Sequence, residues 1–261
     1  VTSTTADGAY KSGDTITVSV SFDESVVVTG TPQISLETGL KDGVGDYTSG
    51  SGSSTLLFDY IIGLTHYSLD LAYENSDALI LNAGTINDAV GNAATLTLPK
   101  VGEANSLSGS KAIIIDNVAP YLSELAEGNL DVNADLDYQS VDILLDLAWS
   151  GSDSISGIYK YEYSLGTTAG GVETIGWTDM SPLTNTSISL TGLSLNEGQT
   201  YYAAARATDK AGNISNVRIG DGIMIDLTIP AVGTVRDGTS KDIDYTSEKT
   251  IFSGNWSGFN D

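Results

Sequence analysis

Cysteine is absent from this sequence of 261 residues, and histidine occurs once, as His66. Without cysteine, disulfides, zinc fingers, iron–sulfur clusters and thiol nucleophiles are excluded. A Ser-His-Asp triad would need His66 beside an acid and an exposed nucleophile. Its neighbours, Leu64 and Tyr67, give it an ordinary strand-to-loop context that favours a plain structural histidine. No P-loop and no histidine-rich metal motif is present. We therefore expect no enzyme in these residues.

Basic residues and long apolar runs are also scarce. The chain has 11 lysines and arginines against 34 acidic residues, a formal net charge of −23. Such a surface repels nucleic acid and anionic lipid and attracts cations. No apolar run approaches the ~20 residues that span a bilayer. We expect no nucleic-acid partner and no membrane insertion, and any export signal or anchor to lie outside this sequence. The 40% hydrophobic content indicates a globular protein.

The sequence instead contains internal repeats. Asp135-Leu136-Asp137-Tyr138 leads across an apolar run to Trp149-Ser150-Gly151. Asp242-Ile243-Asp244-Tyr245 leads to Trp256-Ser257-Gly258 at the same spacing, about 107 residues further along. Two shorter repeats pair residues 113–116 with 223–226, and 88–92 with 209–213. Repeated modules of about 110 residues with short proline-bearing seams are typical of an array rather than of one catalytic domain.

The repeats divide the chain into three parts. We predict a β-sandwich over residues 1–118, a second over residues 119–229, and the truncated start of a third repeat over residues 230–261. The last part supplies at most two of the about seven strands that such a module needs. Ile251, Phe252 and Trp256 would then lack a partner sheet, so we expect disorder there or packing against a neighbouring module or molecule. The chain is expected to be a fragment of a longer array.

The periodicity is that of strands. Ile16, Val18, Val20 and Phe22 alternate with polar residues, as in a half-buried strand. Further strands are expected at 26–28, 34–36, 56–61, 79–81, 96–98 and 113–115, while the Gly/Ser-rich residues 39–54 read as a mobile hairpin or loop. Many short strands with turn signals between them predict an all-β fold of tandem sandwiches in an elongated array.

The part from 119 to 229 resembles a fibronectin type III domain. Residues 193–201 place a leucine and a glycine before Tyr201, as that family does at the start of strand F, and Trp149 stands where its strand-B tryptophan does. The resemblance implies that Trp149 is a core residue and that the alternating Tyr159, Tyr161 and Tyr163 face inward against it. Trp177, in a predicted loop, is the better candidate for an exposed binding aromatic.

The part from 1 to 118 resembles the bacterial Ig-like repeats of large surface proteins and adhesins. The resemblance rests on residues 8–14, 31–33 and 88–92. It implies an extracellular, non-catalytic stalk or adhesive module on a bacterial cell surface. Its partners would be neighbouring repeats of the same chain and a surface ligand, glycan or protein. The alternative is a carbohydrate-binding or spacer module of a secreted polysaccharide-degrading enzyme.

Acidic and amide side chains gather at predicted loop tips and seams. In such a sandwich the BC and FG loops share the pole that faces the preceding domain. The residues expected to meet at the first junction are Asp116, Asn117, Asp153, Asp209 and Asn213. The next junction offers Asp226 with Asn260 and Asp261, and the outer pole of the first module offers Asp23, Glu24, Asp88 and Asn92. Hard oxygen ligands of this kind suit Ca²⁺. The alternative is that these side chains only brace turns.

Overall fold

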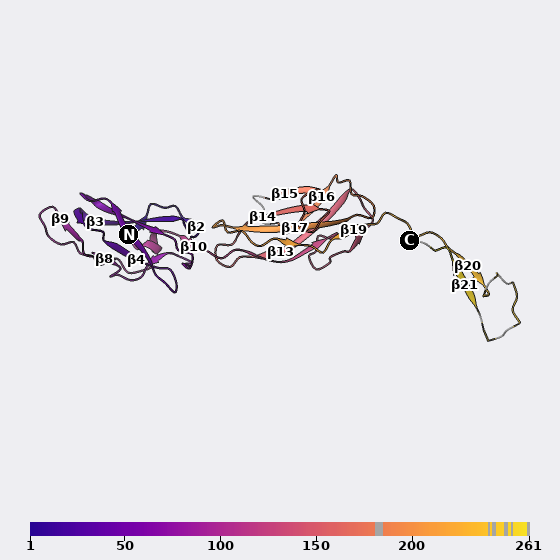
Figure 1. The fold of residues 1–261 in the computed structure, drawn as a ribbon. Helices are drawn as coiled ribbons and strands as arrows, with labels where there is room; N and C mark the ends of the chain where they lie inside the picture. Colours follow the sequence, from indigo (N-terminus) through magenta and orange to yellow (C-terminus); the bar gives the residue numbers. More distant parts are fainter. Residues whose placement is uncertain (181–184, 240, 242–243, 248–249, 252, 260–261) are drawn as a thin grey trace.

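Two elongated β-rich bodies follow one another along the chain, and a thin ribbon extends beyond the second (Figure 1). This computed structural model describes residues 1–261 except 181–184, 240, 242–243, 248–249, 252 and 260–261. We call residues 1–118 the first module, residues 119–229 the second module and residues 230–261 the third segment. The two modules have separate hydrophobic cores. The all-β fold predicted from the sequence is confirmed.

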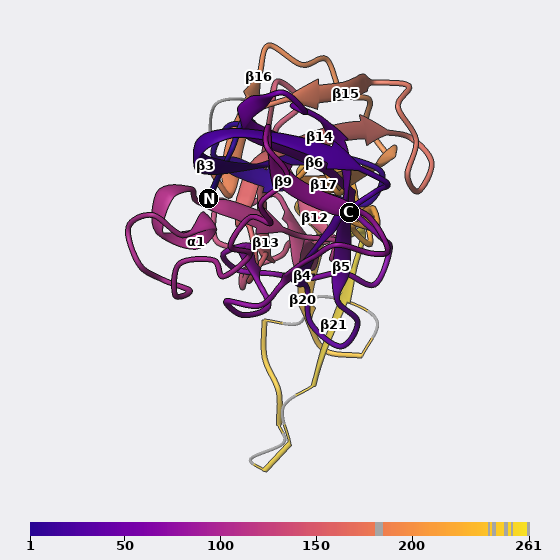
Figure 2. The same cartoon turned by 90° about the vertical axis from the view of Figure 1, so that its left-hand side faces the viewer.

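The first module is a curved sheet folded over its core. Its elements are β1 (Thr2–Ser3), β2 (Gly8–Tyr10), β3 (Thr15–Thr29), β4 (Gln33–Glu37), β5 (Gly43–Ser49), β6 (Ser53–Ile61), β7 (Ala72–Tyr73), β8 (Leu79–Ile80), β9 (Thr85–Asp88), the helical turn α1 (Leu107–Ser110) and β10 (Ile113–Ile115). The main sheet runs β1-β3-β6-β5-β4-β7, with β8 on β4 and β9 on β3. In the end-on view β3 and β6 lie opposite β4 and β5 (Figure 2). A separate parallel pair joins β2 to β10.

Strand β3 joins two of the predicted strands into one. Ile16, Val18 and Val20 are buried in alternation, as predicted. The ladder to β6 breaks after Ser21 and resumes at Val26, and from there β3 also pairs with β9. An irregularity of this kind bends a strand and increases its twist. The strand therefore continues around the end of the core instead of stopping at a turn.

Of the mobile hairpin or loop predicted over residues 39–54, the structure contains the hairpin, because β5 runs through this stretch and pairs antiparallel with both β4 and β6. The glycines serve packing. A Cβ on Gly43 would lie 2.5 Å from the buried ring of Tyr60, and one on Gly45 would lie 3.0 Å from Ile34. The alternation of Gly43 and Gly45 is thus an inward-facing strand pattern made of glycine.

The strand predicted at 96–98 is also absent from the described residues, where this stretch is irregular. Leu98 is nevertheless buried, and its N–H donates to the carbonyl of Ser76 over 2.8 Å. The apolar alternation over residues 96–98 therefore reflects side-chain burial in a segment that does not form a strand.

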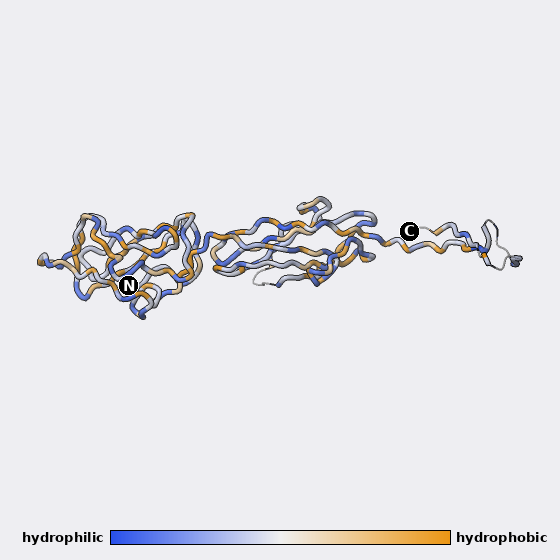
Figure 3. Tube along the Cα trace, turned by 90° about the horizontal axis from the view of Figure 1, so that it is seen from below, coloured by the Kyte–Doolittle hydropathy of each residue, from blue (hydrophilic) through white to orange (hydrophobic). Residues whose placement is uncertain are grey.

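The second module is a sandwich of two sheets. Its strands are β11 (Tyr121–Glu127), β12 (Tyr138–Gln139), β13 (Leu144–Ser152), β14 (Ile158–Gly166), β15 (Ile175–Asp179), β16 (Ser187–Thr191), β17 (Thr200–Asp209), β18 (Arg218–Ile219) and β19 (Ile223–Ile225). One sheet has the order β11-β13-β16 and the other β12-β19-β17-β14-β15, with β18 on β17. The hydropathy-coloured trace shows apolar and polar stretches alternating along both modules (Figure 3).

Trp149 lies in the core of the second module, as predicted, with 1% of its surface exposed. Its ring centroid is 5.8 Å from that of Tyr161 and 6.4 Å from that of Tyr163. Tyr159 does not share this face, since it is 56% exposed. The register between β14 and β17 shifts between Ile158 and Lys160, and this bulge turns Tyr159 out of the alternation. The inward prediction holds for two of the three tyrosines.

The start of β17 is fixed by a side-chain bond. The hydroxyl of buried Tyr201 accepts the N–H of Asn196 over 3.0 Å. Leu195 is buried in the same core, and Leu193 packs against it. A tyrosine at this corner, bonded to backbone a few residues upstream, is a hallmark of Ig-like sandwiches. The pattern read from residues 193–201 therefore describes real local structure.

The third segment contributes β20 (Thr234–Asp237) and β21 (Gly254–Ser257), which pair only with each other among the described residues. Val235 lies opposite Trp256, as Leu125 lies opposite Trp149 in the second module. Trp256, however, is 73% exposed. The described part is a paired ribbon whose tryptophan neither module covers, and the expectation of disorder or of packing against a neighbouring molecule stays a prediction. Phe252 lies outside the described residues.

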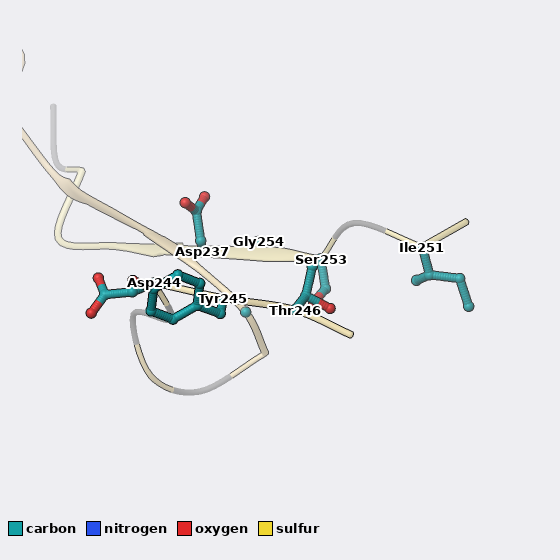
Figure 4. Close-up of a pocket in the computed structure, with 8 residues that line it drawn as sticks. Asp237, Asp244, Tyr245, Thr246, Ile251, Ser253 and Gly254 are labelled. Carbon is teal, nitrogen blue, oxygen red and sulfur yellow. The ribbon is translucent and has the colours of Figure 1, made fainter. Parts of the chain in front are cut away.

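A hollow opens beside this ribbon, lined by Asp237, Gly238, residues 244–246, Ile251, Ser253 and Gly254. The carboxylates of Asp237 and Asp244 point in different directions rather than toward a common centre (Figure 4). Among the described residues no helix is long and apolar enough to cross a membrane.

The close fit of Gly43 is testable. We expect Gly43→Ala to destabilise the first module by about 1–3 kcal/mol, because the new methyl group would overpack against Tyr60, which is itself buried. Gly176→Ala is the control, since a Cβ there meets nothing within 4 Å. Denaturant unfolding of both variants checks this. Equal stabilities would show that Tyr60 moves aside.

Truncation of Trp149 should unfold the second module. We expect Trp149→Ala to cost about 3–5 kcal/mol, comparable to the stability of a small domain. Trp256→Ala removes the same side chain from an exposed position and should change stability by less than about 0.5 kcal/mol. Chemical denaturation followed by circular dichroism separates the two. A small effect of Trp149→Ala would contradict the core assignment.

Candidate metal site

Three carboxylates from separate parts of the chain meet where the first module joins the second. Asp116 follows β10, Asp153 follows β13, and Asp209 ends β17. One carboxylate oxygen of each lies within 4.8 Å of the others. Asp116 is fully buried, Asp209 is 1% exposed and Asp153 is half-buried. The structure thus brings together three of the five residues predicted for this junction as a carboxylate cluster.

Asp116 is held by both modules. Its backbone N–H donates to the carbonyl of Tyr10 in β2 over 2.8 Å. Its Oδ1 accepts the N–H of Val118 at 2.9 Å, and its Oδ2 accepts the hydroxyl and N–H of Ser156 at 2.6 and 3.1 Å. The carboxylate is therefore fixed between the end of the first module and the loop after β13.

The other two carboxylates are oriented by their own loops. Asp153 Oδ1 accepts the N–H groups of Ile155 and Gly157 at 3.2 and 2.6 Å. Asp209 accepts the backbone N–H and the side-chain amide of Asn213, both at 2.8 Å. The same amide nitrogen also donates to the carbonyl of Asp116 at 2.9 Å. Asn213 therefore braces the site and links it to the seam.

The cluster is electrostatically unbalanced. Burial raises the pKa of Asp209, and the charges of Asp116 and Asp153 raise it further, against the lowering effect of the Asn213 bonds. No ion pair among the described residues includes these three acids. Lys11 is close by, but its Nζ donates to the carbonyl of Gly212. A cation at this point would relieve the repulsion.

The turn at Asp209 has a duplicate that lacks this setting. At the outer pole of the first module, Asp88 accepts the backbone and side-chain N–H groups of Asn92 at 2.8 and 2.6 Å. These bonds lower the pKa of Asp88, whereas that of Asp209 is raised. The two turns share their bonding, so the difference comes first from the burial of Asp209 and then from the charges of Asp116 and Asp153 beside it.

The remaining predicted ligands lie elsewhere. Asn117 turns into the first module, where its Oδ1 accepts the N–H of Ser12 at 2.6 Å and its Nδ2 donates to the carbonyls of Gly63 and His66. Asp226 accepts the N–H of Thr228 at 3.0 Å, repeating the turn of Asp116, and belongs to no carboxylate cluster of the described residues. Asp261 and Asn260 lie outside the described residues.

The outer pole gathers its predicted residues loosely. Asp23, Glu24, Asp88 and Asn92 line one open hollow. Among the described residues, the three acids of this pole do not form a group of three whose carboxylate oxygens lie within 4.8 Å of one another. Asp88 is committed to its turn, so this pole offers a less convergent arrangement than the junction does.

Two further candidates have ordinary structural contacts. His66 Nδ1 is 2.6 Å from the hydroxyl of Tyr60, and their rings stack. Trp177 lies in β15 and not in the predicted loop. The guanidinium of Arg206 sits 4.4 Å above its ring and is bonded to Glu162. One face of Trp177 is thereby covered.

A second carboxylate cluster was not singled out from the sequence. Glu127, Asp135 and Asp221 bring their oxygens within 4.8 Å of one another inside the second module. Asp135 opens the repeated Asp-Leu-Asp-Tyr pattern, which was the available signal. Glu127 reads as an ordinary strand end, and its burial could not be inferred.

The bond between the seam and the second module can be tested with Ser156→Ala. We expect a loss of about 1.5–3 kcal/mol, because the variant removes a hydroxyl that donates to the buried carboxylate of Asp116. Ser154→Ala, at an exposed position in the same loop, should be nearly neutral. Thermal and denaturant unfolding measure both. Matching stabilities would mean that Asp116 does not depend on this bond.

Comparisons with known proteins give little further information. No family model matches the sequence, and no curated protein shows significant similarity to it. Among solved structures, the fibronectin(III)-like modules of Clostridium thermocellum CbhA match at 12% identity, covering 85% of this chain and 91% of that one, with a TM-score of 0.34. The chain is similar to those modules, and a match at this level carries no argument about family or function.

Proposed function

We propose that this chain is a non-catalytic, extracellular stalk or adhesive segment of a bacterial surface protein, in which Ca²⁺ at Asp116, Asp153 and Asp209 stiffens the first junction. The observation that carries the proposal is the meeting of these carboxylates from the seam and from two loops of the second module. Each reaches the site from a different segment, so one ion would tie together parts of the chain that otherwise move separately.

The chemistry of the donors favours Ca²⁺. It takes 6–8 oxygen ligands in flexible geometry, and water completes a site whose protein ligands are few. Three carboxylates provide the charge, and backbone carbonyls or water would have to provide the further oxygens. Mg²⁺ needs a tighter octahedral shell and gives up its water reluctantly, so it should bind less well.

The mechanical role follows from the contacts already present. Lys11 of the first module reaches Gly212 of the second, and Asn213 reaches the carbonyl of Asp116. These polar contacts leave three repelling carboxylates in place. Neutralising them would restrict hinge motion at the seam. A ligand at 100 times its dissociation constant adds about 2.7 kcal/mol to the stability of the state that binds it.

The architecture supports the repeat assignment within this proposal. The two-sheet second module, with Trp149 in its core and the Tyr201 bond at its corner, fits a fibronectin III-like sandwich. The first module is proposed as its Ig-like neighbour. The ribbon of the third segment pairs Val235 with Trp256 in the register of Leu125 with Trp149, which supports a further repeat beginning there.

The second candidate function is an accessory carbohydrate-binding or spacer module of a secreted polysaccharide-degrading enzyme. Its specific support is the pair of aromatic side chains on one sheet of the second module. Tyr159 is 56% exposed, and the guanidinium of Arg206 stacks on the ring of Trp177. A glycan array probes it directly. Binding that is lost in Tyr159→Ala or Trp177→Ala would favour this candidate over a stalk.

Calcium should stabilise the chain and EDTA should destabilise it. We expect millimolar Ca²⁺ to raise the melting temperature by several degrees, more than Mg²⁺ does, and to reduce the spread of interdomain distances seen by small-angle scattering. Asp153→Asn should abolish the change in interdomain distances and reduce the rise in melting temperature, since it removes a ligand of the junction site. It keeps an acceptor for the Gly157 N–H, so the loop itself should persist.

The control is Asp88→Asn, which removes the same charge from a duplicate of the Asp209 turn and should leave the Ca²⁺ response intact. Equal melting in Ca²⁺, in EDTA and at matched ionic strength would refute the junction site and leave only general charge screening.

A further inference from the structure

The second carboxylate cluster lies at the end of β11 that points away from the first junction. Tyr121, at the near end of β11, pairs with Ser152 beside the junction loops, whereas Glu127 ends the strand six positions on. One oxygen each of Glu127, Asp135 and Asp221 lies within 4.8 Å of the others. This cluster is separate from the site described above and shares no residue with it.

Glu127 is the unusual member, because it is fully buried and incompletely bonded. Its Oε1 accepts the N–H of Ala203 over 3.0 Å. Its Oε2 has no hydrogen-bond partner among the described residues. A buried carboxylate oxygen without a partner is costly, so the position requires a proton or a cation. Burial raises the pKa of Glu127 to about 7; the backbone N–H groups of Ala203 and Gly222 oppose this rise, and the charges of Asp135 and Asp221 add to it.

The backbone around Glu127 is shaped to receive it. Strand β17 pairs with β18 at Ala204 and Ala205 and with β19 at Thr200 and Tyr201. Between these partners lies the loop 220–222, where the side chain of Glu127 takes the free N–H of Ala203. A Cβ on Gly220 would lie 2.1 Å from Oε1 and 2.2 Å from Oε2. Glycine is therefore required beside the carboxylate.

The two exposed members complete a set of acids without a counter-charge. Asp135 Oδ1 accepts the backbone N–H of Glu127 at 2.6 Å. Burial raises the pKa of Asp135, and its hydrogen bond and repulsion with Asp221 add to the rise. None of the ion pairs formed by the described residues reaches these acids. Two carboxylates that face each other and a third with an orphan oxygen form a cation's ligand set.

We propose that Glu127, Asp135 and Asp221 form a second Ca²⁺ site, lodged between the two sheets of the second module. Glu127 belongs to the sheet of β11, and Asp221 precedes β19 in the opposite sheet. The ion lies beside the part of β17 between its pairing with β18 and its pairing with β19, and it holds the loop 220–222 against β11. Its effect is on the module itself, whereas the junction site acts between modules.

Calorimetric titration with CaCl₂ tests this site in the Asp153→Asn variant, in which we expect no Ca²⁺ binding at the junction site. The measurement is made at about pH 8, where a carboxyl with a pKa of about 7 is ionised. We expect one Ca²⁺ to bind. Adding Asp221→Asn or Glu127→Gln should weaken it at least ~10-fold, because Ca²⁺ affinity depends on the number of ligand charges. The amide resonance of Ala203 should shift during the titration.

The matched control is Asp137→Asn, an exposed acid two residues from Asp135 that lies outside the cluster. It should change the affinity by less than about twofold, as a screened surface charge does. Three outcomes overturn the proposal: no binding in the Asp153→Asn background, binding unaffected by Asp221→Asn and Glu127→Gln, or an equal loss in Asp137→Asn. Asp221 is exposed, so its variant keeps the test valid even if Glu127→Gln misfolds. Failure of the junction site would leave this result unchanged.

Discussion

The arrangement of the two modules depends on one buried carboxylate. Asp116 is tied by its backbone to β2 of the first module and by its side chain to Ser156 of the second. An ionised group in a fully buried position is tolerated only where hydrogen bonds or opposite charge replace water. Its bonds to Ser156 and Val118 provide part of that replacement. They also fix where the seam enters the second module, and thereby bring Asp153 and Asp209 into range.

The same local structure takes on different chemistry in different surroundings. The turn of Asp88 and the turn of Asp209 share their hydrogen bonds, and so do the seam turns of Asp116 and Asp226. Alone, each side chain satisfies a turn. Within the part of the chain that the structure describes, only the first junction brings one turn of each kind together with another carboxylate. An acid of this kind can therefore stabilise a turn and also act as a metal ligand, because the hydrogen bonds of the turn orient its carboxylate.

Much of this fold could be predicted because alternation and repetition are local properties of a sequence. The strand through Ile16 and the burial of Trp149 followed from them. Three features could not be predicted. The glycines at 43 and 45 resemble a flexible loop until the ring of Tyr60 is placed against them. A bulge after Ile158 turned Tyr159 outward. Glu127 became buried through pairing between distant strands, which no local pattern encodes.

At the candidate junction site the three predicted carboxylates lie close together, whereas the two predicted amides make other bonds. The repeat placed Asp116, Asp153 and Asp209 on segments that the sandwich topology brings to one pole. Asn117 and Asn213 were expected beside them as ligands. Asn117 instead bonds to backbone groups of the first module, and Asn213 stays at the junction, where its Nδ2 donates to Asp209 and to the carbonyl of Asp116. An amide has both donors and acceptors, so short-range bonds capture it more readily than they capture a carboxylate.

Both modules also pair an early strand in parallel with their last one, β2 with β10 and β12 with β19. When the two ends of a module are pulled apart, strands paired in this way slide along each other. Their hydrogen bonds lie across the direction of pull and must break together, whereas an antiparallel hairpin pulled at its open end separates bond by bond. Tension along the chain would then be resisted by these two parallel strand pairs, which contain three and two residue pairs. Asp116 and Asp226 each come directly after the last strand of such a pair. An ion bound beside Asp116 would therefore reinforce the chain at the point where force passes from one module to the next.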